Sequence, residues 1–298
     1  INMMHKNKSF QNLLELNLAI LFISTSGVLG RYIDLPVPVT ICSRAIIGGF
    51  FIFLFCKWRR FDFKVQKQDR STLFVSGLLL GLHCLTYFYS LKLSNVAIGM
   101  ISLFTFPIIT TFLEPMILRT KFERIHLVLG IFVLLGVYFL IPNLNFDHDY
   151  SKAIALGVLS AFFYSLRNII TKSKIKDYNG SVLMLYQLVV ITVMLSPFYF
   201  LENLDNFTIQ LPGVIILSLL TTAIGHTWFL YSFKKFSVTS ASIISSLQPV
   251  YGILMGMVFL YEYPEPRTII GGTFIIVTVI VESIFTYRKS MQMNDPRK

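Results

Sequence analysis

The side chains in this sequence that could do chemistry are a few charged and imidazole groups set within long apolar runs. Arg44, His83 and His226 each lie near the middle of such a run. A guanidinium can hold a carboxylate through two parallel hydrogen bonds, and an imidazole can exchange a proton near neutral pH. The alternative for Arg44 is a fixed pair with a protein acid or carbonyl groups, and each histidine could instead be a neutral link between helices.

Other polar and aromatic side chains are expected to share a cavity with these three. Arg167 lies in a further apolar run, and it could either line the cavity or extend toward the lipid headgroups. An apolar wall with a few placed polar groups suits a small amphipathic metabolite. The predicted substrate-binding set consists of Arg44, His83, Tyr87, Tyr89, Arg167, Gln187, His226, Trp228 and Gln248.

Two prolines fall within predicted membrane segments. Pro107 and Pro249 would each remove one helical hydrogen bond, so both are predicted to act as hinges or kinks. The sequence has no nucleotide-binding loop, HExxH pair or acyl-transfer elbow, and Cys42, Cys56 and Cys84 lack the spacing of a metal or redox site. We therefore expect no cofactor, no metal and no enzymatic reaction.

The elements that must hold these residues are membrane helices. The chain is 54% hydrophobic and 14% charged, with a mean hydropathy of +0.67. Its apolar residues come in runs of about twenty, the length of a helical span. The predicted fold is an all-α integral membrane protein with ten transmembrane helices, at residues 12–30, 37–56, 72–91, 95–118, 125–141, 153–171, 181–201, 213–233, 238–260 and 268–287.

Basic residues follow the predicted topology. Most of the 26 Lys and Arg residues fall on one side of the predicted spans, whereas Arg31, Lys92, Lys152 and Arg267 fall on the other. Because positively charged loops stay in the cytoplasm, both termini are predicted to be cytoplasmic. The net charge of +11 is therefore explained by membrane topology, and no nucleic-acid partner is expected.

The sequence contains an internal repeat. The tetrapeptide at Tyr89–Lys92 (Tyr-Ser-Leu-Lys) precedes Pro107 by the same spacing as the one at Tyr231–Lys234 (Tyr-Ser-Phe-Lys) precedes Pro249, and the same offset relates Val96 to Val238. An odd number of spans separates the copies, so the halves 12–141 and 153–287 should run in opposite directions through the bilayer. Such inverted repeats are typical of transporters, whose binding site lies between the halves.

The same region resembles a known family. Gln248-Pro249 is followed by Glu262 and by Gly271-Gly272 at the start of the last apolar run, and the first half has the run FYSLKLSNVA before Pro107. This pattern resembles the EamA type of the drug/metabolite transporter superfamily. The first half departs from it, because Thr120 stands where the second half has its acid.

The resemblance implies ten helices around a central cavity and a function in moving amino acids or other small metabolites outward across the bacterial inner membrane. The expected function is thus a secondary transporter in the lipid bilayer, an exporter of small molecules. Its coupling to protons and its oligomeric state stay open, and a monomer is plausible. The alternatives are an intramembrane enzyme that uses His83 and His226, and a non-transporting membrane scaffold.

Overall fold

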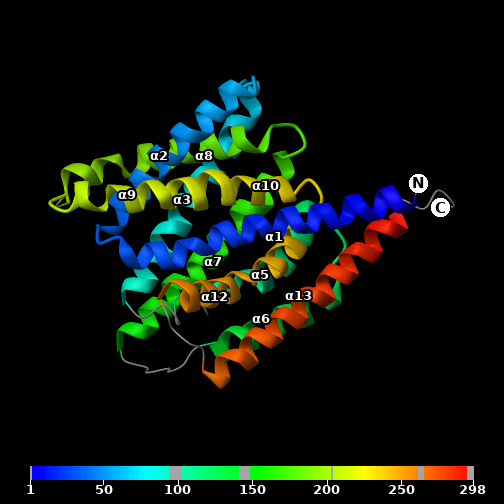
Figure 1. The fold of residues 1–298 in the computed structure, drawn as a ribbon. Coiled ribbons are helices and arrows are strands. Elements are labelled where there is room, and N and C mark those ends of the chain that lie inside the picture. The colour runs from blue at the N-terminus through cyan, green and yellow to red at the C-terminus, as the bar shows by residue number, and fades with distance from the viewer. Residues whose placement is uncertain are drawn as a thin grey trace.

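The computed structural model describes residues 2–93, 99, 102–140, 148–202, 204–260 and 265–293. Every regular element in these ranges is a helix, which confirms the predicted all-α class for the described part of the chain. Val96, residue 141 and Glu262, which enter the sequence predictions above, lie outside these ranges. The elements, coloured in chain order in Figure 1, are α1 (Asn2–Tyr32), α2 (Val37–Trp58), η1 (Lys67–Asp69), α3 (Arg70–Leu93), α5 (Phe106–Leu118), α6 (Arg124–Leu140), α7 (His148–Lys174), α8 (Gly180–Leu195), η2 (Ser196–Phe200), α9 (Phe207–Leu217), η3 (Ser218–His226), α10 (Thr227–Ser232), α11 (Val238–Ser245), α12 (Gln248–Leu260) and α13 (Pro266–Met293).

Several of these helices are membrane spans by length and composition. Seven helical stretches of the described chain have at least 18 residues and are apolar enough to cross a membrane. They overlap seven of the ten predicted spans. The apolar helices Phe106–Leu118 and Arg124–Phe139 are shorter. Helices are the expected form because lipid offers no partner to backbone N–H and C=O groups. The chain is thus a multi-pass membrane protein.

Long-range packing joins the two parts of the chain. α3 packs along α7 and α8, and α1 packs against η3, α10 and α12. α2 contacts α8 and η3, while α6 and α13 form a pair at one edge of the bundle (Figure 1). Figure 1 also shows that the first turns of α1 and the last turns of α13 lie at the same end. The centre of the bundle is therefore built by α1, α2, α3, α7, α8 and the segment from α9 to α10.

Both predicted hinge prolines lie at breaks between helical segments. Pro107 is the second residue of α5, and Pro249 is the second residue of α12. A turn precedes each of these helices, at Phe104–Thr105 and at Ser246–Leu247. The structure thus differs from the expected loss of a hydrogen bond inside a continuous helix, because a proline in the first helical turn has no such bond to lose. The hinge role stays a prediction.

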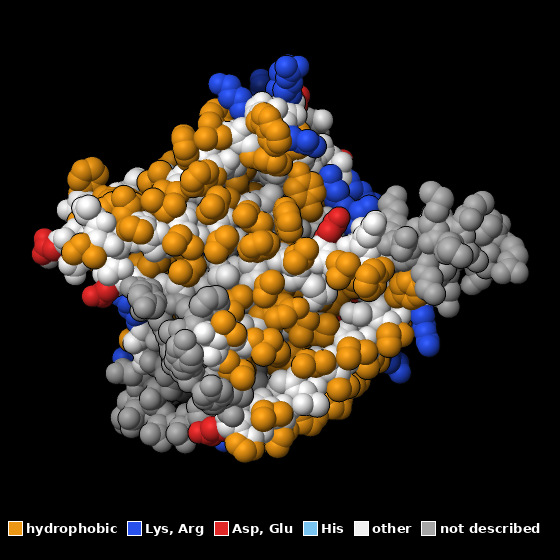
Figure 2. Space-filling view, viewed as in Figure 1, with side chains coloured by type: hydrophobic (Ala, Val, Ile, Leu, Met, Phe, Trp, Pro, Cys, Tyr) orange, Lys and Arg blue, Asp and Glu red, His pale blue; other side chains and the backbone are white. Residues whose placement is uncertain are grey.

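Large apolar side chains cover the outside of the helices. Phe50, Phe74, Val193, Ile209 and Val258 are all more than half exposed. In Figure 2 such side chains occupy much of the visible face, whereas Lys and Arg gather at the end of the molecule where α2 ends. An apolar surface of this extent is what lipid contact requires.

A cluster of polar side chains lies at the end of the bundle where α3 begins. Asp69 accepts a hydrogen bond from the Tyr178 hydroxyl at 2.6 Å and pairs with Lys174 Nζ, also at 2.6 Å. The bond to Asp69 raises the pKa of Tyr178 above its ordinary value, because the carboxylate stabilises the protonated phenol. The cluster ties the start of α3 to the end of α7 and to the connection that follows α7.

Candidate functional site

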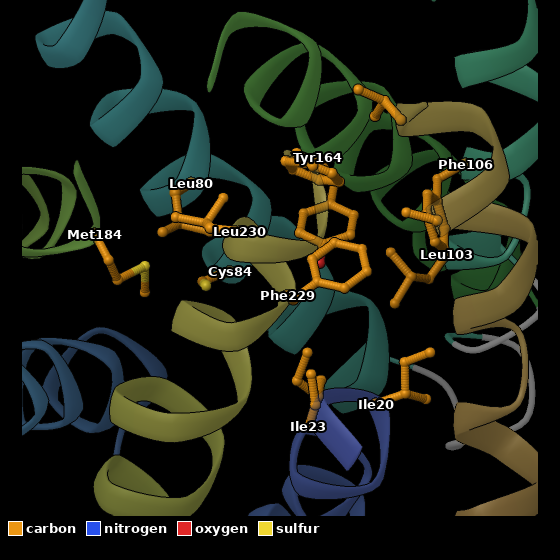
Figure 3. Packing of buried hydrophobic residues seen from close by; sticks show 14 of the residues in the cluster. Ile20, Ile23, Leu80, Cys84, Leu103, Phe106, Tyr164, Met184, Phe229 and Leu230 are labelled. Atoms are coloured by element: carbon orange, nitrogen blue, oxygen red, sulfur yellow. The ribbon is translucent and has the colours of Figure 1, made fainter. Parts of the chain in front are cut away.

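A narrow pocket lies between α2, α3, α8 and η3. Its wall is mostly apolar, and its polar groups come from Arg44, Thr222 and His226. Figure 3 shows Met184 of α8 pointing toward Leu80 and Cys84 of α3, all from the pocket wall. The residues around the pocket are Ile41, Arg44, Ala45, Leu80, Cys84, Met184, Leu188, Ile191, Thr222 and His226.

Arg44 reaches this pocket from α2, two turns after Val37. Its side chain is buried, and its Nε donates a hydrogen bond to the Thr222 hydroxyl oxygen at 2.5 Å. This is the only hydrogen bond of the guanidinium to the described part of the chain, and no described carboxylate lies within ion-pair distance. The two Nη groups can therefore receive a ligand.

His226 lies at the end of η3, a π-helical segment. Such wide turns within α-helices frequently occur at functional sites. The imidazole is buried on the pocket wall, and its Nδ1 has no hydrogen-bond partner among the described residues. A buried nitrogen without a partner costs free energy unless a ligand or a water molecule forms a hydrogen bond with it.

His83 lies outside the pocket wall and has partners. The Ser160 hydroxyl lies 2.8 Å from His83 Nδ1, and the Ser160 carbonyl oxygen lies 3.2 Å from it. The imidazole stacks on Tyr164 with ring centroids 4.4 Å apart, and Tyr164 in turn stacks on Phe229. Figure 3 shows Tyr164 and Phe229 together in the centre of the bundle.

Arg167 of α7 is fully buried and bonded only to neutral groups in the described chain. Its Nε donates to Gln187 Oε1 at 2.9 Å, and a second nitrogen, Nη2, donates to the same oxygen. Nη1 donates to Asn168 Oδ1 at 2.9 Å. Gln187 Nε2 donates onward to Ser76 and Thr171. The network satisfies the hydrogen bonds of Arg167 without neutralising its charge.

The other predicted site residues differ in how far their side chains are buried. Tyr87 is half-buried and stacks on His83, and Gln248 is half-buried at the start of α12. Tyr89 and Trp228 are 41% and 43% exposed, and the Trp228 ring edge contacts Phe22. The structure thus places Arg44 and His226 at one pocket, with His83, Tyr87, Arg167 and Gln187 in the surrounding layer. It does not bring Tyr89, Trp228 or Gln248 to the pocket wall.

Thr222, Tyr164 and Cys84 were not among the predicted site residues. The internal repeat could have indicated two of these residues, Thr222 and Cys84. Its offset of 142 residues carries Leu80 to Thr222 and Cys84 to His226, and all four line the pocket. Thr222 also precedes His226 by one helical turn, the spacing of neighbours on one face.

The buried carboxylates of the described chain are engaged elsewhere. Glu114 accepts hydrogen bonds from the backbone N–H groups of Val238 and Thr239, at 2.8 and 2.7 Å, at the start of α11. Glu282 lies 3.4 Å from His126 and accepts from the Thr286 hydroxyl. Within the described ranges no group of three His, Cys, Asp or Glu residues could hold a metal ion.

Comparisons with known proteins give a consistent result. The EamA-like transporter family matches twice, at residues 13–141 and 151–284. The pseudopaline exporter CntI of Pseudomonas aeruginosa is 22% identical over 84% of this chain and 87% of its own, and the uncharacterized transporter YoaV of Bacillus subtilis is 22% identical over 86% and 90%. A solved crystal structure of a protein shares the fold, with a TM-score of 0.79 at 16% identity over 93% of this chain and 98% of that chain.

Proposed function

Because the chain belongs to the EamA-like transporter family, we propose that it is a secondary transporter that exports small metabolites, amino acids or related compounds. The observation that carries the proposal is the central pocket, which α2, α3, α8 and η3 line together and which holds a buried guanidinium and an unpaired imidazole nitrogen. A catalytic or scaffolding role requires no pocket shared between two halves.

We propose that these halves, 12–141 and 153–287, are inverted repeats of five spans each, ten in all. Two separate family matches support this division. The packing also supports it, because contacts in one place have counterparts when each helix is replaced by its repeat equivalent. The contact of α3 with α7 corresponds to the contact of η3 and α10 with α1. The contact of α5 with α7 corresponds to that of α12 with α1. Inverted repeats alternate access largely by rocking one half against the other around the binding site.

The pocket suggests how the cycle runs. It is too narrow for a metabolite in this structure, so the helices that line it must move apart to admit one. Pro107 and Pro249 lie at helix breaks that could serve as hinges for that movement. Arg44 would bind the substrate, and His226 would carry any coupled proton.

The proposed location is the bacterial inner membrane with both termini in the cytoplasm. The gathering of basic residues where α2 ends supports this orientation, since positively charged loops remain cytoplasmic. The common end of α1 and α13 supports an even number of spans. The relative from Pseudomonas aeruginosa is an exporter, which supports outward transport.

Efflux from reconstituted vesicles tests the proposal. Vesicles containing the protein and loaded with a panel of labelled amino acids should release at least one of them faster than empty vesicles do. Overproduction in bacterial cells should raise resistance to toxic analogues of the same compound. Equal release from both kinds of vesicle, across the panel and across a bacterial small-molecule extract, would contradict a transport function.

A further inference from the structure

We infer that the substrate of the central site is a small acid with at least two carboxylates, which Arg44 and Arg167 bind from two different helices. The inference rests on the proposed transport function and adds the chemical class of the substrate. It starts from an imbalance of charge: two guanidiniums are buried at the centre of the bundle, and no described carboxylate pairs with either.

Burial makes this imbalance significant. The Arg44 side chain is 7% exposed and that of Arg167 is 0% exposed. A buried charge is unfavourable unless it is paired, so natural proteins keep such groups with a counter-ion or where a ligand provides one. The neutral partners Thr222 and Gln187 satisfy individual N–H donors but leave both positive charges in place.

Both charges act on the same small region. Arg44 lines the pocket, and Nη2 of Arg167 lies 3.4 Å from the sulfur of Met184, which lines the same pocket. A single carboxylate would therefore leave a net positive charge in a buried site, whereas a second carboxylate would neutralise it.

No buried carboxylate of the described chain can supply this neutralisation without giving up its present partners. Glu114 is bound to the N–H groups at the start of α11, and Glu282 faces His126. Asp69 pairs with Lys174 at the end of the bundle. The counter-charge must therefore arrive with the substrate.

Arg44 has open donors for one carboxylate, and Arg167 has donors that a second carboxylate would take over from Gln187. The Nη groups of Arg44 have no described partner, so they can hold one carboxylate end-on while Nε stays on Thr222. His226 Nδ1, also unpaired, lies on the same wall. A second carboxylate can replace Gln187 Oε1 at Arg167, whose Nε and Nη2 both donate to that oxygen and so present a matched fork.

An unbiased export experiment tests the substrate class. Vesicles containing the wild-type protein are loaded with a bacterial small-molecule extract, and mass spectrometry compares what leaves them with what leaves empty vesicles. We expect the exported compounds to carry two or more carboxylates. Export of neutral, cationic or singly charged compounds instead would overturn the inference while leaving the transport function standing. If nothing leaves, the proposed function itself fails.

Variants of the two arginines give the matched test. Arg44→Gln and Arg167→Gln should each slow export of the identified acid about 10- to 100-fold, the effect of one lost charged hydrogen-bond pair. Arg70→Gln changes an exposed arginine at the start of α3 and should have no effect.

Because Arg167→Gln could impair folding, Arg167→Lys and melting temperatures are measured in parallel. The lysine keeps the charge and should retain more export than the glutamine. Equal export by Arg167→Gln and wild type, at equal melting temperature, would overturn the role of Arg167.

Discussion

The guanidinium of Arg167 donates from Nε to the side-chain oxygen of Gln187 at 2.9 Å, and neither side chain is exposed. Gln187 in turn donates to Ser76 at 3.0 Å and to Thr171 at 3.1 Å. The network joins α3, α7 and α8. Since glutamine is uncharged, it orients Arg167 without neutralising its positive charge.

Replacing this glutamine by an acid should separate stability from transport. Gln187→Glu would pair directly with Arg167, and a charge-assisted hydrogen bond contributes about 1.5–3 kcal/mol. We expect the melting temperature to stay equal or rise, while export falls at least about tenfold because the site charge is neutralised. Gln187→Leu is the control, and it should lower the melting temperature because Arg167 loses its acceptor. Wild-type export by Gln187→Glu would show that the charge of Arg167 is not used.

The membrane helices could be predicted from the sequence more completely than the pocket. Apolar runs and basic loops predicted a helical membrane protein, because lipid dictates both span length and loop charge. Arg44 and His226 were both predicted to line the binding cavity, and in the structure they line one pocket. Tyr89 and Trp228 fall within the same runs but face outward. Which side of an apolar helix faces lipid depends on packing, and uniformly apolar segments carry little signal for it.

A second gap concerns the partners of buried ionisable groups. Arg119 lies close to Glu114 along the chain, whereas the structure pairs this carboxylate with the N-terminus of α11. Glu282 lies near the end of the last apolar run, yet it is fully buried beside His126. Both contacts join distant segments, so neighbouring residues in the sequence carry no information about them.

The Glu114 contact predicts a loss of stability. Glu114→Gln keeps the shape of the side chain but replaces a carboxylate that accepts from Val238 N, Thr239 N and the Thr239 hydroxyl. The free energy of unfolding should fall by about 1–3 kcal/mol, measured as a lower melting temperature in detergent. Glu123→Gln, which removes an exposed pair with Lys289, should cost about 1 kcal/mol or less. Equal effects of the two substitutions would contradict the capping role.

Close packing of α3 on α8 predicts a different loss. A Cβ added at Gly77 would meet Val190 Cβ at 2.7 Å and the backbone Cα of Gln187 at 3.1 Å. Gly77→Ala should therefore force the helices apart and cost about 1–3 kcal/mol. Gly252→Ala is a matched control, because no described atom lies within 4 Å of its added Cβ. A melting temperature of Gly77→Ala at or above that of Gly252→Ala would contradict this packing.

The two histidines should respond differently if protons are coupled to transport. His226 Nδ1 is unpaired on the pocket wall, whereas His83 Nδ1 lies within hydrogen-bond distance of Ser160. His226→Gln should abolish the response of flux to an imposed pH gradient, while exchange of labelled for unlabelled substrate at equal pH survives, because exchange moves no net protons. His83→Gln should mainly lower the melting temperature. Wild-type flux that does not respond to a protonophore would defeat the coupling hypothesis for both.

The central claim is that one pocket opens alternately to the two sides of the membrane, and Cys84 provides a direct probe of it. The sequence has three cysteines, of which only Cys84 lines the pocket. In a chain with Cys42→Ala and Cys56→Ala, a membrane-impermeant thiol reagent should modify Cys84 when added to either face of oriented vesicles. A chain that retains only Cys56, which is 0% exposed, should stay unmodified from both faces. Modification of Cys84 from one face alone, or from neither, would contradict the account.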